Sequence, residues 1–180
     1  MSHRINSIRK IKANLILELL DKNREKNILK KICFGKGADI GCGSDKISSN
    51  CIGVDLFGKG EIGKFGCENK KKSHADIKAS GDELPFKNNE LDFIVAKHNL
   101  EHYDNPEKTL IEWKRVLKKG GKIGVIVPDD KYVNTKKLDP THYSKFTMKP
   151  LEELFKKVGF KILGKGYALK KWSIYLIAEK

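Results

Sequence analysis

A pair of glycines and two carboxylates form the first group of residues that could do chemistry. An apolar run containing Asp39 passes directly into Gly41-Cys42-Gly43. Glycines at such a turn let the backbone approach a ligand closely, because no side chain stands in the way. Asp55 ends the next apolar run, where its carboxylate could accept hydrogen bonds from the two hydroxyls of a ribose. The pattern favours a ligand that contains a ribose.

A dinucleotide-binding turn is the alternative for this segment. That fingerprint needs a third glycine, whose position is occupied here by Lys46. It also places an acid about 20 residues further on, whereas Asp55 follows Gly41 by only 14 residues. A nicotinamide-dependent dehydrogenase is therefore disfavoured.

Three further runs occur in a fixed order along the chain. Residues 81–95 read GDELPFKNNELDFIV, residues 96–102 read AKHNLEH, and residues 115–122 read RVLKKGGK. With the glycine turn and Asp55, they closely resemble the class I S-adenosylmethionine-dependent methyltransferases. The resemblance is to the branch that carries LPF, a strand, LEH and then RVLKPGG, and it extends over roughly 36–178.

The resemblance implies that the cofactor is S-adenosylmethionine and that S-adenosylhomocysteine is a product. The residues implied to bind it are Asp39, Gly41, Cys42 and Gly43 at its amino-acid end, Asp55 at the ribose hydroxyls, Leu56 against adenine, and Asp82 or, as second choice, Asp76 at the adenine amino group. Two departures from the family pattern are visible. The stretch between Asp55 and Leu84 lacks the expected helix, and Lys119 replaces the proline of the last motif.

Lys97 and His98 follow the fourth apolar run. In open α/β sheets ligands bind at the carboxyl ends of strands where the strand order reverses, so we expect both side chains to line the cofactor or substrate pocket. If the acceptor must lose a proton, His98 and His142 are the candidate bases, because imidazole titrates near neutral pH. We expect Glu101 and His102 to have a structural role.

The segment 129–146 is the candidate substrate-side loop. It contains His142 and Phe146, a pair that also occurs in relatives, together with several acids and tyrosines. An ordinary connection would be shorter. We expect this loop to cover the methyl acceptor.

The elements that must position these residues follow from apolar periodicity and glycine. Strands are predicted over 38–40, 51–56, 74–77, 91–96 and 122–127, and helices over 5–20, 106–117 and 151–158, the second closed by Gly120 and Gly121 and the third by Gly159. Strands at 160–163 and 172–178, joined by a connection containing Gly164 and Gly166, should form an antiparallel hairpin. The fold class is α/β: a Rossmann-like, doubly wound, mostly parallel sheet. The resemblance adds that it has seven strands with an antiparallel last one.

Composition is typical of one domain over 1–180, with an added N-terminal helical segment, 1–33. Charged residues make up 33% of the chain, and no run approaches the roughly 20 apolar residues of a membrane span. The basic N-terminus lacks a signal-peptide core, so we expect a cytoplasmic protein. The four cysteines show no paired zinc-ligand spacing, and we expect no metal site.

The formal net charge of +14 favours anionic partners. A lysine-rich proteome would explain the excess equally well. We expect a small-molecule methyl acceptor first. An RNA or protein acceptor comes second, and a non-catalytic, cofactor-binding partner subunit third. The oligomeric state stays open.

Overall fold

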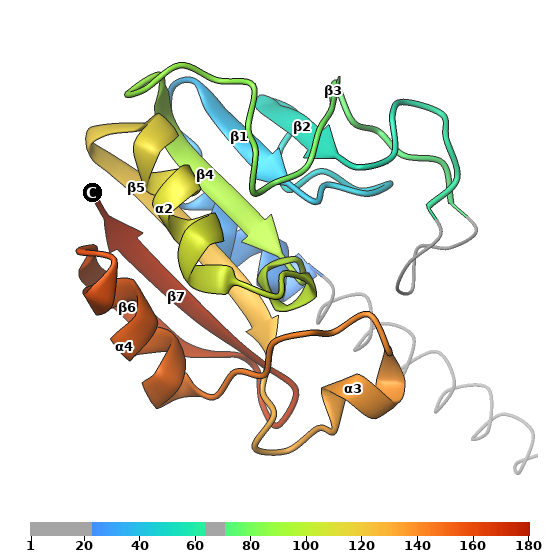
Figure 1. The fold of residues 1–180 in the computed structure, drawn as a ribbon, viewed down its shortest axis with the longest axis vertical. Coiled ribbons are helices and arrows are strands. Elements are labelled where there is room, and N and C mark those ends of the chain that lie inside the picture. The colour runs from blue at the N-terminus through green and yellow to red at the C-terminus, as the bar shows by residue number, and fades with distance from the viewer. Residues whose placement is uncertain (1–22, 64–70) are drawn as a thin grey trace, which may run out of the picture.

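The computed structural model describes residues 23–63 and 71–180. Within these ranges the chain forms one seven-stranded sheet in the order β3-β2-β1-β4-β5-β7-β6 (Figure 1). β7 is antiparallel to both of its neighbours, whereas β1 to β5 pair in parallel. The predicted α/β class, with a mostly parallel sheet and an antiparallel last strand, is confirmed. The helix predicted over 5–20 lies outside the described residues.

The strands are β1 (Gly37–Ile40), β2 (Cys51–Asp55), β3 (Ile77–Lys78), β4 (Leu91–Lys97), β5 (Leu117–Pro128), β6 (Lys161–Leu169) and β7 (Ser173–Glu179). The chain passes outward from β1 to β3 and then returns to the other side of β1, where β4 pairs with it. Register places Ile40 beside both Val54 and Ala96. The carboxyl ends of β1, β2 and β4 therefore meet at the reversal point, where such sheets bind ligands.

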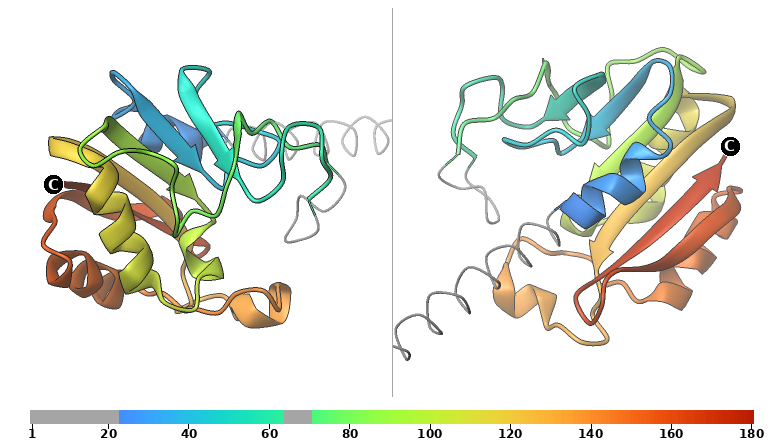
Figure 2. Two further views of the ribbon diagram at one scale, coloured as in Figure 1. Left: turned by 45° about the horizontal axis from the view of Figure 1, so that its top comes forward. Right: turned by 180° about the vertical axis from the view of Figure 1, so that it is seen from behind.

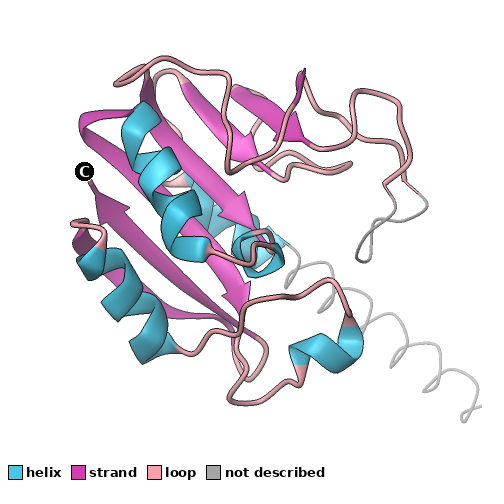
Figure 3. Ribbon diagram, in the orientation of Figure 1, coloured by secondary structure: helices cyan, strands magenta, loops and turns pink. Residues whose placement is uncertain are grey.

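Helices cover both faces of the sheet. Figure 1 and Figure 3 show α2 (Pro106–Val116) and α4 (Met148–Lys157) on one face, and the view from behind in Figure 2 shows helical residues 23–30 on the other. The short α3 (Thr135–Leu138) lies beyond the carboxyl end of β5, and the 3-10 helix η2 (Leu100–His102) follows β4. Two apolar clusters fill the layers, one including Trp113 and Phe155 and the other Leu29 and Phe93.

The start of α2 is fixed by a proline and a cap. Pro106 occupies the first turn, and the side chain of Asn105 accepts a hydrogen bond from the Lys108 amide at 3.0 Å. Further along, the Trp113 indole donates to the Gly81 carbonyl at 2.7 Å. Arg115 donates to the Phe86 carbonyl at 2.9 Å. The LPF and RVL motifs are thus hydrogen-bonded to each other and stabilise the connection into β4.

The prediction that Gly120 and Gly121 end α2 is wrong. The helix ends at Val116, and β5 begins at Leu117, five residues earlier than predicted. The register with β4 shifts between Leu91 and Phe93. Gly120, at φ 75°, lies within this irregular start of the strand. The glycines therefore accommodate a bulge in a strand, which backbone-permissive residues favour.

The tail hairpin is antiparallel as predicted, but its turn is elsewhere. Gly164 and Gly166 lie within β6, and the turn falls at residues 170–172, where Lys171 has φ 61°. A Cβ at Gly166 would meet the Tyr175 ring at 3.0 Å, so this glycine makes room for a cross-strand aromatic ring. The predicted third strand is only Ile77–Lys78.

Candidate active site

The turn after β1 has the backbone geometry that its glycines imply. The Gly41 and Cys42 amides both donate to the Val54 carbonyl, at 2.8 and 3.2 Å. Gly41 and Gly43 have φ of 70° and 51°, in the left-handed region that favours glycine. A Cβ at Gly41 would lie 2.2 Å from Nδ2 of the Asn99 side chain. The turn after β1 therefore packs directly against the segment that follows β4.

Asp55 joins this turn at the carboxyl end of β2. Its Oδ2 accepts a hydrogen bond from the Gly43 amide at 2.9 Å, and its Oδ1 accepts one from the Phe57 amide at 3.0 Å. The carboxylate is thus held in one orientation, and each oxygen keeps a lone pair for another donor. Leu56, the next residue, is 54% exposed. A fixed carboxylate beside an exposed apolar side chain suits a ribose with an attached base.

Asp39 lies within β1 and is almost fully buried. Its Oδ2 accepts a hydrogen bond from the Ile47 amide at 2.6 Å, which closes the loop after the glycine turn. Burial raises the pKa of the Asp39 carboxyl to about 7, although that hydrogen bond and the charge of Lys97 act in the opposite direction. Asp39 therefore holds the loop after the glycine turn through its hydrogen bond to the Ile47 amide. Its buried surroundings disfavour the ionised carboxylate.

Three further predicted cofactor residues, Cys42, Asp76 and Asp82, differ in their surroundings. Cys42 is buried between the glycines, and burial raises the pKa of its thiol, so it packs as a neutral side chain. Asp76 accepts from the Gly53 amide and from Lys46, both at 2.8 Å. Asp82 is half-buried and accepts from the Ser80 hydroxyl. Asp76 is thus already paired beside the middle of β2.

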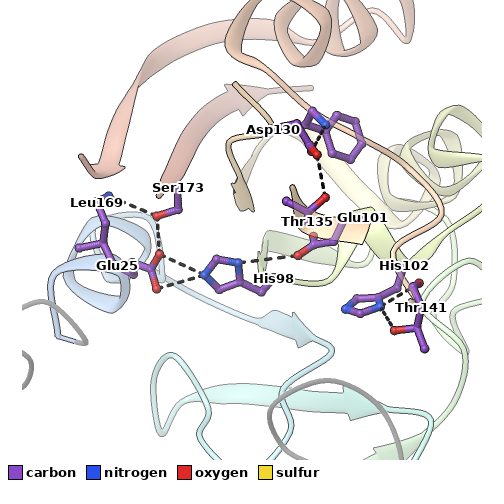
Figure 4. Close-up of polar contacts among 10 residues, drawn as sticks. Glu25, His98, Glu101, His102, Asp130, Thr135, Thr141, Leu169 and Ser173 are labelled. Atoms are coloured by element: carbon purple, nitrogen blue, oxygen red, sulfur yellow. Dashed lines mark hydrogen bonds and ion pairs between the residues drawn. The ribbon is translucent and has the colours of Figure 1, made fainter. Parts of the chain in front are cut away.

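His98 directly follows β4 and lies between two carboxylates (Figure 4). It has φ 52°, a conformation that costs energy for a residue with a Cβ. Its Nε2 lies 3.1 Å from the Glu25 carboxylate, and its Nδ1 lies 3.7 Å from that of Glu101. Burial would lower the pKa of His98, but the two carboxylates outweigh it and raise the pKa to about 9. His98 is therefore a charged imidazolium at neutral pH.

Glu25 completes this network from a distant part of the chain. It is buried, and its Oε1 accepts a hydrogen bond from the Ser173 hydroxyl at 2.6 Å. Burial would raise the pKa of Glu25, but His98 and Ser173 lower it below its usual value. Lys97 adds positive charge near both Glu25 and Asp39. No sequence motif indicated Glu25, because it lies in a helix before the family motifs begin.

The segment 129–146 folds back on the carboxyl ends of β4 and β5. Asp130 accepts from the Thr135 hydroxyl at 2.7 Å and from the Phe146 amide at 3.0 Å. The Tyr143 amide donates to the Glu101 carbonyl at 2.9 Å. The segment is therefore a closed loop fixed to η2 (Figure 4).

The second predicted catalytic histidine, His142, lies in this loop and contacts η2. Its ring packs edge-on against that of His102, with centroids 4.7 Å apart. His142 is buried, at 9% exposure.

Asn99 and Tyr103 were missed by sequence reasoning. The Tyr103 hydroxyl donates to the Asn99 side chain at 3.0 Å, and so helps to hold Asn99 against Gly41.

Comparison with known proteins finds a matching domain and one curated relative. Residues 38–125 match the methyltransferase domain family. The uncharacterized protein MJ1123 of Methanocaldococcus jannaschii is 33% identical over 155 residues, which cover 80% of this chain and 73% of that protein.

Solved structures show the same fold. A chain of the complex between the Haloferax volcanii methyltransferase activator Trm112 and a methyltransferase aligns with a TM-score of 0.67 at 15% identity, over 91% of each chain. An S-adenosylmethionine-dependent methyltransferase of Thermotoga maritima aligns with a TM-score of 0.63 at 21% identity, over 96% of this chain and 97% of its own.

The motifs, the sheet order and these relatives agree. In the described part of the chain no helix has both the length and the apolar character needed to cross a bilayer. The match over residues 38–125 and the shared fold support a class I methyltransferase whose cofactor is S-adenosylmethionine.

Proposed function

We propose that this enzyme transfers the methyl group of S-adenosylmethionine to a small-molecule acceptor by in-line displacement. One observation carries the proposal: the glycine turn and Asp55 form a single corner, joined by the 2.9 Å hydrogen bond from the Gly43 amide. The Asp55 carboxylate, which can bind a ribose, thus lies beside a glycine turn whose backbone a ligand can approach closely. Both lie where the strand order of the sheet reverses. The same corner leads directly to Asn99 and His98 after β4.

The residues of this corner fit the cofactor. Gly41 and Gly43 present bare backbone to its amino-acid end, Asp55 offers lone pairs to its ribose, and Leu56 offers an exposed apolar surface to its base. S-adenosylmethionine supplies an already activated methyl group. The protein therefore has to align the acceptor and exclude water, and alignment of this kind can be worth about 7–11 kcal/mol.

The acceptor side supports a small molecule. The loop 129–146 is closed on itself by Asp130 and fixed to η2 through the Tyr143 amide. Such a loop suits a small binding surface rather than the extended groove that a polymer would need. The raised pKa of His98, about 9, favours the protonated imidazole at neutral pH and argues against a role as general base. His98 instead orients the acceptor and places a positive charge near it.

An RNA or protein acceptor is the second candidate, and the net charge of +14 favours it. A phosphate-binding surface would give affinity that falls steeply with salt. We expect no binding of a generic single-stranded RNA at low salt. Tight, salt-sensitive binding would replace the small-molecule proposal. The third candidate is a cofactor-binding partner subunit, because the Haloferax neighbour was solved with an activator protein.

Thermal unfolding with S-adenosylmethionine, S-adenosylhomocysteine and NAD tests the cofactor site. A ligand at about 100 times its dissociation constant adds about 2.7 kcal/mol, and a domain of this size gains about 2–4 °C per kcal/mol. We expect a rise of several degrees with the two adenosyl sulfur compounds and none with NAD. Full stabilisation without turnover of any small-molecule panel would favour the partner-subunit candidate.

A further inference from the structure

Glu101, His102 and His142 form a cluster that the methyl-transfer proposal does not use. Glu101 and His102 come from η2, and His142 comes from the loop 129–146. Each residue offers one potential ligand atom, and these atoms all lie within 4.8 Å of one another. Glu101 is 1% exposed. Two imidazoles and a carboxylate therefore converge, with Glu101 and His142 buried and His102 half-buried.

Three polar atoms of this cluster lack hydrogen-bond partners. Both carboxylate oxygens of Glu101 and the Nδ1 of His142 are buried without one, and among the described residues no other buried side-chain nitrogen or oxygen is left unpaired. His98 lies 3.7 Å from Glu101, which is close enough for an ion pair but too long for a hydrogen bond. Since unpaired buried polar groups are costly, three of them in one place indicate a missing ligand.

We propose that Glu101, His102 and His142 bind a divalent metal ion of the first transition series, of the Zn²⁺ or Mn²⁺ type. Imidazole and carboxylate donors suit these ions. Donors bound at about 2.0–2.2 Å lie no more than about 4.4 Å apart, so only a small inward movement of the side chains is needed.

The surroundings of His102 support a ligand role. The Thr141 hydroxyl donates its single proton to Asp139 at 2.6 Å, so at its 3.0 Å contact with His102 Nδ1 it can only accept. Nδ1 therefore carries the proton, and Nε2 keeps its lone pair for a metal. An imidazole oriented by a hydrogen bond through its other nitrogen is the usual arrangement of a metal-binding histidine.

The position of the cluster links it to the transfer reaction, and this step rests on the proposed function. Asn99 packs against Gly41 of the cofactor corner, and Glu101 follows it by two residues. Three protein ligands leave coordination positions open, as in catalytic rather than structural metal sites. The class of acceptor that fits such a position is a small molecule with a hydroxyl or carboxylate oxygen.

Isothermal titration of the chelator-treated full chain with ZnCl₂, MnCl₂ and MgCl₂ tests the site. We expect one Zn²⁺ or Mn²⁺ per chain and weaker Mg²⁺ binding, because Mg²⁺ prefers oxygen ligands. His142→Asn and Glu101→Gln should each weaken binding by more than the roughly 10–100-fold that the loss of an outer-shell partner costs. His74→Asn, which changes a histidine outside the cluster, should leave it unchanged. Absence of stoichiometric binding, or equal affinity in folded His142→Asn, would overturn the proposal.

A measurement on the unmodified protein covers the case in which the variants do not fold. Addition of Zn²⁺ should shift the ring NMR signals of His102 and His142 and leave those of His74 in place; shifts confined to other histidines would refute the site. Thermal stabilisation by S-adenosylmethionine is recorded on the same samples. Cofactor binding without metal binding would refute the metal site alone. Metal binding without cofactor binding would refute the proposed function.

Discussion

Replacement of Asp39 by asparagine should remove a pH-dependent loss of stability. The Asp39 carboxyl has an ordinary pKa of 3.8, and burial raises it to about 7 in the folded protein. Each pKa unit corresponds to about 1.4 kcal/mol, so holding the ionised form lowers the free energy of unfolding by about 4 kcal/mol. The asparagine side chain cannot ionise, and its amide oxygen can still accept the hydrogen bond from the Ile47 amide.

The sign of the effect follows from proton binding. Below pH 4 both the folded and unfolded chains carry the proton, so the favourable contribution is complete. Between about pH 4 and 7 the folded chain binds one proton more, and stability falls as the pH rises. Above pH 7 the loss is complete. About 3 kcal/mol of it should fall between pH 5 and 8.

Urea unfolding without cofactor, followed by tryptophan fluorescence at pH 5 and at pH 8, measures this change. Relative to the wild type, Asp39→Asn should gain about 3 kcal/mol on going from pH 5 to pH 8. Asp104→Asn, at an exposed position, should follow the wild type. If Asp39→Asn and the wild type lose stability in parallel over this range, the buried-charge reasoning is refuted.

Three further variants test the site. Asp55→Asn should lower the affinity for S-adenosylmethionine at least tenfold by titration calorimetry, because ribose hydroxyls bind a charged acceptor more strongly than a neutral one; unchanged affinity would remove Asp55 from the site. Gly41→Ala should lose more stability and more cofactor affinity than Gly60→Ala, since both have positive φ but only Gly41 would meet a neighbour, Asn99, at 2.2 Å; equal losses in the two variants would show that the contact does not matter. Ser173→Ala should destabilise the protein by about 1–3 kcal/mol in urea, because it removes a hydrogen bond to the Glu25 carboxylate, and a change within error would contradict that estimate.

The sequence predicted those features that depend on neighbouring residues. The glycine turn, Asp55 at a strand end and the apolar faces of α2 and α4 all follow from local spacing, and the structure has them. The start of β5 was mistaken because Gly120 and Gly121 look like a helix end, while the backbone uses them in a bulge against β4. Gly166 looked like a turn residue from its neighbours in the sequence. The reason for this glycine, room for the Tyr175 ring, lies on another strand and is not visible locally.

The electrostatic part of the site was not predictable in the same way. The pKa of His98 depends on Glu25, which is 73 residues away, and the tautomer of His102 depends on Thr141, which is 39 residues away. No local pattern encodes such distances. The spacing of the cysteines predicted no metal site, whereas the proposed ligands are two histidines and a glutamate that only the fold brings together.

The contact between Glu25 and Ser173 has a consequence for the order of assembly. It joins residues 148 positions apart, and β7, which contains Ser173, inserts between β5 and β6. While the chain is being synthesised, β1 to β5 can pair before β7 has left the ribosome, but Glu25 then lacks one of its two partners. The charged network around His98 is therefore complete only after the last strand is in place, and a chain that stops before Ser173 would lack it however well its first half had folded.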